Sequence, residues 1–535
     1  MATALFPEGN LIRHIGEALG PRFQTDDFAH LFPRLGQPGR DPARLARVTV
    51  CQYLAGVSDR QAAENVRRCL DWQYALALPL EERGFAASGL SEFRTRLVQG
   101  QAEQRLFDTV LTGLRERGLL KARGRHRTDS THVLAAIRTL NRLASVAETL
   151  RHALNDRADV APDWLRAQIT PECFDRYQRR VEEYRLSKDT EERQRVAETI
   201  GRAGVALLTA LEAPTAPAGL SARPALQVLR QVWSQQYDGP TPDVRWRTAE
   251  DLPPPARLLC CPYATAARYA TKRETPWSGS KGQLTETGDE AGPHRITNVE
   301  PPPATTNDVE LTPIIHPPLA AQDLLPPEHW VDTGYVAAEH RVTSRTAQAI
   351  ELGGPVLTDN RWQAQSPEGY AGACFAMDWP AHTGTCPQGK GSRRWTPGHD
   401  QQGSGQDGIA LQCDPADCAA CPVRACSPQA ARGPRTLKLR PPAQPEALQA
   451  ARHQQRTPAV KERSATRAGV EGTRSQGVRA FTLRHARYLG QAKTHLHHLL
   501  MAVASNRVRG VEGLAGTPQA QTRTSSFAAL AGASG

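Results

Sequence analysis

Apolar residues recur with helical spacing in the first part of the chain. Within 41–80 they predict two short helices, the first closed by Gly56 and the second opened by Ser58, which a glutamine follows three residues later. Two helices joined at a glycine turn are compatible with a DNA-binding helix-turn-helix, and also with the commoner ordinary helical hairpin. Apolar positions on one face of 106–114 predict a further helix that ends near Gly118.

The period of the pattern then changes. The run 128–133 has strand-favouring residues and follows a basic segment, so we expect a strand there, with alternate side chains on one face. Leucines and valines at three- and four-residue spacing in 135–158 predict a long amphipathic helix, and helical, charge-rich sequence continues to about residue 213. Proline-rich stretches at 214–218 and 252–256 indicate a connector.

Short strands return in the second half of the chain. They are expected at 283–287, 296–299 and 330–335. The segment 353–442 is rich in Gly, Pro and Cys and lacks sustained periodicity, whereas 446–509 is strongly helical and basic. The small-residue-rich end, 517–535, is expected to be mobile.

Composition adds a preference for polyanions. The 535 residues include 66 Lys and Arg against 55 Asp and Glu, a formal charge of +11. A basic but otherwise ordinary enzyme from an Arg-rich proteome would show the same balance. The first 20 residues do not show the pattern expected of a secretory signal, and no apolar run approaches the roughly 20 residues of a membrane helix. We therefore expect a cytoplasmic protein of two to four domains.

Five of the eleven cysteines crowd into one short segment. Cys418-x2-Cys421 followed by Cys426, with Cys386 or Cys413 as a fourth thiol, could hold a tetrahedral structural zinc ion. In a reducing compartment the alternative is a set of reduced thiols that pack a small insertion. The other six cysteines are expected to be buried small side chains.

Three stretches contain acidic residues in a recognisable context. They read RTDSTHV at 127–133, LLPPEHWVDTGY at 324–335 and RAGVEGTRSQGVR at 467–479. They resemble the three acidic signatures of bacterial insertion-sequence transposases of the DDE class, in the long branch with a cysteine-rich insertion. Similar wording at 58–62, 90–94 and 484–488 extends the resemblance over nearly the whole chain.

The resemblance implies a metal-dependent active site. Asp129, Asp332 and Glu471 would hold two Mg²⁺ ions, which Mn²⁺ could replace, and would act as the catalytic residues. Taken singly, each has a bland interpretation: Asp129 as a turn or cap, Asp332 as a loop residue and Glu471 as a solvated ion-pair partner. Their order and their longer context favour the metal site.

The fold implied is α/β: a ribonuclease-H-like mixed sheet with helical and Cys-rich insertions, plus an N-terminal all-α DNA-binding domain. The N-terminal domain would cover 1–120 and the catalytic domain 121–510, with the helical insertion at about 135–255 and the Cys-rich insertion at about 353–442. Residues 511–535 would form a mobile tail.

The resemblance further implies double-stranded DNA partners, the terminal inverted repeats and the target DNA. Joining two ends implies a homodimer or a larger synaptic complex, associated with the bacterial nucleoid and without a membrane. Around Glu471, Arg467 and Arg474 lie at minus four and plus three, which would place them on the same helix flank. A solvated helix face is the alternative for each cation expected to contact DNA: Arg467, Arg474, Arg479, Arg484, Arg487 and Lys493.

Some positions depart from the family's wording. Ser464 stands where relatives commonly have Tyr, and the phrases CPYA at 261–264, GSKGQ at 279–283 and GRAG at 201–204 also differ. A catalytically decayed, DNA-binding derivative of such an element is therefore the alternative function. A general metal nuclease without strand transfer is a second rival.

Overall fold

Two compact units make up the chain in the computed structural model. Residues 10–517 are described, except 21–22, 34, 36–38, 138–139, 181–188, 240–242, 273, 290–293, 358–361, 367–369, 400–406 and 425–432. Unit 1 combines Met1–Ala122, Asp129–Asn307 and Val470–Gly535, and unit 2 combines Arg123–Thr128 and Asp308–Gly469. In the described part of the chain, no helix is both long enough and apolar enough to cross a membrane.

Unit 1 begins with short helices. These are α2 (Leu11–Leu19), η1 (Thr25–Asp27), η2 (Ala29–Leu31), α3 (Pro42–Ala55), α4 (Asp59–Arg68), α5 (Leu70–Ala75), α6 (Ser88–Gln99) and α7 (Glu103–Glu116). Gly56 ends α3 in the left-handed conformation, with φ 66°, and the Ser58 hydroxyl accepts a hydrogen bond from the backbone N–H of Gln61 at 3.2 Å. The predicted boundaries between these two helices are therefore confirmed, as is the end of α7 before Gly118.

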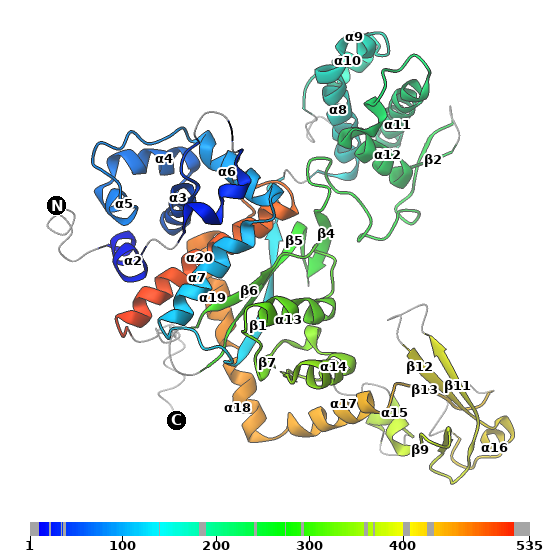
Figure 1. The fold of residues 1–535 in the computed structure, drawn as a ribbon. Coiled ribbons are helices and arrows are strands. Elements are labelled where there is room, and N and C mark those ends of the chain that lie inside the picture. Colours follow the sequence, from blue (N-terminus) through cyan, green and yellow to red (C-terminus); the bar gives the residue numbers. More distant parts are fainter. Residues whose placement is uncertain are drawn as a thin grey trace, which may run out of the picture. The chain divides into compact units, whose positions relative to one another are not determined.

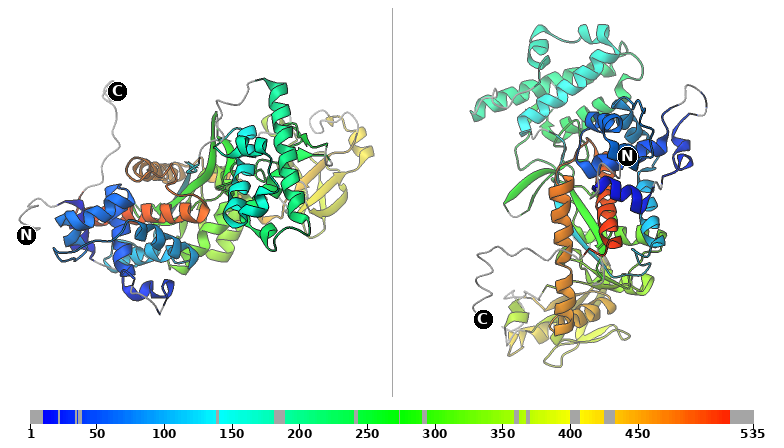
Figure 2. Two further views of the ribbon diagram at one scale, coloured as in Figure 1. Left: turned by 90° about the horizontal axis from the view of Figure 1, so that it is seen from above. Right: turned by 90° about the vertical axis from the view of Figure 1, so that its left-hand side faces the viewer.

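The last helix of the chain completes the core of these N-terminal helices. Helix α20 (Gln491–Leu514) contacts α2, α3, α6 and α7, and on another part of its surface it contacts strand β6 (Ile296–Glu300). Figure 2 shows α20 in orange-red among the blue N-terminal helices in both views. Its apolar side chains from Leu496 to Ala504 are fully buried. The N-terminal helices thus depend on a segment almost 400 residues away in sequence for their packing.

Two adjacent histidines on α20 make the stability of unit 1 sensitive to acid. Burial lowers the pKa of His497 to about 4, helped by Arg487, and burial beside His497 and His495 holds the pKa of His498 well below its usual range. When a histidine is harder to protonate in the folded state, the protein loses folding stability as the pH falls below the unfolded-state pKa of about 6.5. We expect the urea unfolding midpoint to drop between about pH 7 and pH 5, and His497→Leu to reduce that drop. His485→Gln, at an exposed site, should leave it unchanged; an equal effect of both variants would contradict this assignment.

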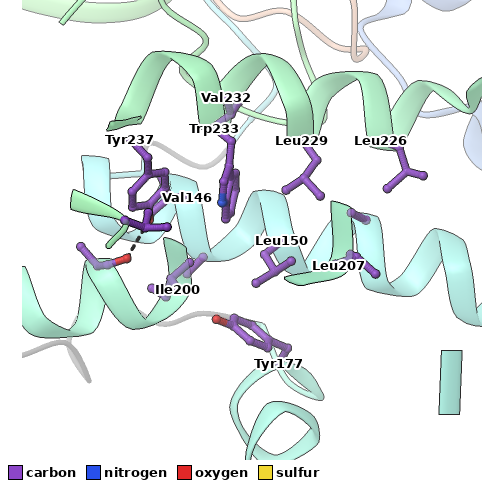
Figure 3. Close-up of a cluster of buried hydrophobic side chains, with 14 of the residues drawn as sticks. Val146, Leu150, Tyr177, Ile200, Leu207, Leu226, Leu229, Val232, Trp233 and Tyr237 are labelled. Carbon is purple, nitrogen blue, oxygen red and sulfur yellow. Dashed lines mark hydrogen bonds between the residues drawn. The ribbon is translucent and has the colours of Figure 1, made fainter. Parts of the chain in front are cut away.

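The helical insertion forms a bundle with its own core. Its helices are α8 (Arg142–Val160), α9 (Pro162–Arg166), α10 (Pro171–Tyr177), α11 (Thr190–Glu212), η4 (Leu220–Ala222) and α12 (Pro224–Gln236). Figure 3 shows Leu150, Trp233 and their neighbours meeting between α8, α11 and α12. A Cβ atom at Gly204 would lie 2.2 Å from the Trp233 ring, so glycine is required where α11 and α12 touch. The α12 helix lies between the two proline-rich stretches, where the sequence indicated only a connector.

In unit 1 the strands lie to one side of β1 (His126–Leu134), whose residues from Asp129 onward belong to this unit. Their order is β4-β5-β1, and β6 pairs antiparallel with β5; the other bounds are Arg268–Lys272 for β4 and Thr275–Thr287 for β5. A small separate pair joins β2 (Tyr237–Asp238) to β3 (Arg245–Trp246). At Gly279 a Cβ atom would lie 2.1 Å from the carbonyl oxygen of Val133, so glycine lets β5 approach β1 closely.

In unit 2 the first residues of β1 pair in parallel with β7 (Glu328–Trp330), with His126 opposite His329, and β7 pairs in parallel with β8 (Glu351–Gly353). Helices follow the chain between and around these strands: η5 (Asp308–Leu311), α13 (Thr312–Ala321) and α14 (Ala338–Gln348). The prediction of a strand over 330–335 was wrong. The strand ends at Trp330, because the Asp332 carboxylate caps a 3-10 turn, η6 (Thr333–Tyr335).

The cysteine-rich part of unit 2 contains small antiparallel sheets, although the sequence showed no periodicity there. The elements are α15 (Trp362–Gln365), η7 (Gly372–Cys374), β9 (Ala376–Asp378), β10 (Thr383–Thr385), β11 (Ser392–His399), β12 (Asp407–Cys413), α16 (Pro415–Ala419) and β13 (Thr436–Leu439). Strands β11, β12 and β13 form one sheet around buried Leu411. Helices α17 (Ala443–Gln454) and α18 (Pro458–Thr466) follow and end unit 2, as Figure 1 shows. With α19 (Gly469–Phe481) and α20, they confirm the predicted helical C-terminal region.

Candidate active site

Asp129 lies on β1 with its carboxylate almost fully enclosed. The residues before and after Asp129 on β1 are buried, and Asp129 itself is 9% exposed. One carboxylate oxygen, Oδ1, accepts the backbone N–H of Ser130 at 2.8 Å. The other, Oδ2, accepts Nη1 of Arg474 at 2.7 Å. A buried charge of this kind is stable only when it is paired or bound to a cation.

Glu471 approaches Asp129 through the helix that carries Arg474. It is in the first turn of α19, it is exposed, and Arg474 follows it three residues later. Residues three apart lie on the same helix flank, so the flank that reaches Asp129 also carries Glu471. Within unit 1, two of the acids singled out in the sequence are therefore brought to one region.

A buried ionic network fixes α19 against β5 and α20. Glu286 on β5 is fully buried; its Oε2 accepts a hydrogen bond from the Thr473 hydroxyl and Nη1 of Arg509 at 3.2 Å. Arg509 also donates to the Gln476 side chain at 2.9 Å. Because Thr473 and Gln476 are both on α19, this network sets the rotation of the helix that carries Glu471. Nothing in the sequence around Glu286 indicated this network, because the strand that carries it is rich in Thr, Ser and Gly.

The remaining predicted acid, Asp332, belongs to unit 2. It follows β7, it is exposed, and it accepts the backbone N–H of Thr333 at 2.8 Å. His329, in the middle of β7, is buried. Its Nε2 is 2.7 Å from the Thr128 hydroxyl, and its Nδ1 is 3.0 Å from Nε2 of His316. Burial holds the pKa of His329 well below its usual range, so this chain of polar groups carries no charge near neutral pH.

Arg467 does not share a helix with Glu471. The chain leaves α18 at Thr466 and enters α19 at Gly469, and the intervening N–H groups of Arg467 and Ala468 bond three residues back instead of four. The prediction that Arg467 lies one helical turn before Glu471 was therefore wrong. Arg127 explains the interruption: its guanidinium bonds to the Thr466 carbonyl and fills the space that a Cβ atom at Gly469 would need.

Positive charge gathers beside β1 in unit 1. Burial lowers the pKa of His132, and the charges of Arg484, Lys272, His485 and Arg474 lower it further, in that order. The Arg484 guanidinium also donates from Nε to the Thr131 hydroxyl at 3.0 Å. A group of cations beside the strand that carries Asp129 suits a phosphate backbone.

The other predicted DNA-binding residues fall into two kinds. Arg487 donates to the Val57 carbonyl at 2.8 Å and stacks over Tyr53, so it joins the C-terminal segment to the N-terminal helices. Arg479, in the last turn of α19, is exposed, and Lys493, at the start of α20, is half-buried. The arginine at 487 thus has a structural task that the sequence did not reveal.

Four cysteines line one pocket of 240 Å³ in the Cys-rich part of unit 2: Cys386, Cys413, Cys418 and Cys421. Burial raises the pKa of Cys413 to about 12, and the nearby thiols of Cys418 and Cys386 raise it as well. Cys426 lies outside the described residues. In the part of the chain that the structure describes, no three His, Cys, Asp or Glu side chains form a ready-made metal site.

Two protein families match parts of the chain. A family described as "Transposase DDE domain" matches residues 385–509, which include α19 and Glu471. A family described as "Transposase domain (DUF772)" matches residues 1–96, the N-terminal helices. No match was found among curated proteins or among solved structures.

Proposed function

We propose that this chain is a DDE transposase of the insertion-sequence type, which cleaves DNA at the ends of its element and joins them to target DNA, using divalent metal ions. Asp129, Asp332 and Glu471 would be the metal ligands and catalytic residues. The observation that carries the proposal is the contact between Asp129 and the α19 flank that bears Glu471. The match to the DDE domain family already includes α19, and the proposal adds Asp129 and Asp332 to it.

The third ligand is supported by its place within unit 2. Asp332 follows the carboxyl end of β7 and is exposed, so its carboxylate is accessible to a metal ion. It also lies in the acidic stretch at 324–335 that the resemblance assigns to the metal site. We therefore propose that Asp332 completes the ligand set.

The strand order supports a ribonuclease-H-like fold, which we propose for the catalytic part. Antiparallel β6, β5 and β4 lie to one side of β1 in the strand order of unit 1, and parallel β7 and β8 follow β1 in unit 2. A mixed sheet is what the resemblance implied. The Cys-rich and helical segments are then insertions between its elements.

Each residue has a separate task in the proposed reaction. Bound Mg²⁺ would activate the attacking oxygen and stabilise the leaving oxygen of an in-line displacement at phosphorus. The carboxylates fit that role, because hard divalent ions prefer oxygen ligands. Arg484, with the neighbouring cations beside β1, would hold the phosphate backbone, and the Glu286 network would keep Glu471 in place.

We propose double-stranded DNA as the partner, both as element ends and as target. The N-terminal helices α3 and α4 would bind the end sequence, and the joining of two ends would need a dimer or a larger complex. The bacterial nucleoid is then the place where the protein acts. Two copies of the site in one complex would explain how both ends are processed together.

The test is a cleavage and joining assay. Purified full-length protein is incubated with a labelled duplex that carries the DNA flanking its gene, with Mg²⁺, with Mn²⁺ or with a chelator. Metal-dependent nicks at the element end and joined products are expected. Retarded complexes without nicks would identify a decayed, DNA-binding derivative instead, and nicks without joined products would identify a general nuclease.

We also propose that the cysteine pocket binds one structural zinc ion, with Cys386, Cys418, Cys421 and Cys426 as ligands, or with Cys413 in place of Cys386. Thiols that crowd one small pocket fit Zn²⁺, and a closed thiolate site has no open position for catalysis. Cys418→Ser should release the metal and lower the thermal stability of the β11–β13 sheet.

The measurement is the zinc content of dialysed protein. Wild type is expected to retain close to one zinc per chain and Cys418→Ser much less. Cys374→Ser is the matched control, because Cys374 is exposed and does not line the pocket, and this variant should retain the metal. Metal-free wild-type protein with unchanged stability would show that the thiols only pack the insertion.

A further inference from the structure

The guanidinium of Arg474 already contacts the Asp129 carboxylate, which is the proposed ligand of a metal ion. Nη1 of Arg474 lies 2.7 Å from Oδ2 of Asp129 and 3.4 Å from the carbonyl oxygen of Ser130. Asp129 is 9% exposed, and the side chain of Arg474 is 27% exposed, so water screens the pair only partly.

A divalent ion and this guanidinium compete for the same oxygen. If Oδ2 coordinated a metal while Arg474 stayed, two cations would share one carboxylate in a poorly solvated place, and their repulsion would weaken metal binding. A metal ion on Oδ1, which accepts the backbone N–H of Ser130, would still share one small carboxylate with the Arg474 guanidinium, so the two cations would remain close to each other. Metal entry therefore requires Arg474 to leave the carboxylate.

We propose that Arg474 is a latch that holds Asp129 in a closed, metal-free state and must withdraw before a divalent cation binds. This inference rests on the proposed metal site. After withdrawal, Arg474 remains on the helix flank of Glu471, where its guanidinium can bind a phosphate of the DNA backbone. Metal and DNA then favour the same open state, so each increases the affinity of the other.

The experiment measures Mn²⁺ binding to the full-length, DNA-free protein by the electron paramagnetic resonance signal of the free ion. Arg474→Gln is expected to bind Mn²⁺ at least about five-fold more tightly than wild type, because a charge-assisted hydrogen bond no longer has to be broken. Arg474→Met, which keeps an unbranched stem without charge, is a second variant with the same expected result in case the first fails to fold.

Arg479→Gln is the matched control. It removes the same charge from the same helix, but Arg479 is exposed and five residues further on, so it points away from the flank of Arg474. Equal affinity in wild type and both Arg474 variants, or an equal gain in Arg479→Gln, would overturn the latch. Asp129→Asn separates the two hypotheses: if it binds Mn²⁺ as wild type does, the proposed metal site itself fails.

Discussion

Asp332→Asn is expected to reduce metal-dependent cleavage and joining of end DNA by at least about 1,000-fold, because loss of several kcal/mol of charge stabilisation costs tenfold in rate per 1.4 kcal/mol or so. The substitution replaces a carboxylate oxygen by an amide and leaves the shape unchanged. The Asn side chain can still accept the backbone N–H of Thr333, so the cap on η6 persists. The rate should fall without a change in fold.

Asp332 separates chemistry from stability better than Asp129 does. It is exposed, so its replacement should change the free energy of unfolding by no more than about 0.5 kcal/mol, whereas Asp129 is enclosed and ion-paired. Glu471→Gln should behave like Asp332→Asn, and exposed Glu462→Gln on α18 is the control that should retain activity. Binding of end DNA, measured by gel retardation, should survive in every variant. Full activity of Asp332→Asn would remove this residue from the site.

Glu286→Leu is expected to destabilise unit 1 by about 3–5 kcal/mol, because it leaves the buried guanidinium of Arg509 without its carboxylate. The Thr473 hydroxyl loses its acceptor in the same step, so the position of α19 loosens. Urea unfolding at neutral pH measures the loss. Activity should fall as well, even at temperatures where the variant is folded, because Glu471 moves with the helix.

A second substitution shows whether the charge is the cause. In Glu286→Leu with Arg509→Met both charges are gone, and we expect much of the lost stability to return, since a buried ion pair can often be replaced by apolar side chains at little cost. Glu286→Gln keeps the shape and an acceptor for Thr473, so its effect should be milder. A double variant no more stable than Glu286→Leu would mean that packing around β5, and not the buried charge, dominates.

Local patterns predicted the helices well, because helix boundaries are written in neighbouring residues. Gly56 and Ser58 end and begin helices for reasons of backbone conformation and capping that involve no distant residue. The same holds for β1, where alternation and β-branched residues mark the strand that carries Asp129. The resemblance then supplied an expectation that no local pattern contains, namely which acids are proposed to form one site.

Long-range pairing explains what could not be predicted. Nothing near Glu286 in sequence indicates that Arg509 and Thr473 will neutralise it, and nothing near Arg487 indicates its bond to Val57. The break before α19 has the same origin, since the Arg127 guanidinium that fills the space beside Gly469 comes from the other end of the catalytic region. The strand predicted over 330–335 extended too far, because valine and tyrosine favour strands locally. In the structure the Asp332 cap turns the chain after β7.

The packing of α20 within the N-terminal helices sets an order of events during synthesis. Helices α2 to α7 leave the ribosome first, but the apolar surfaces that α20 covers stay open until residue 514 has been made. At translation speeds of about 5–20 residues per second that interval lasts roughly 20–80 s, long enough for a nascent chain to meet chaperones or another copy of itself. A premature stop anywhere upstream of α20 would therefore release a fragment whose N-terminal helices expose apolar surface and aggregate, and not an independently folded domain.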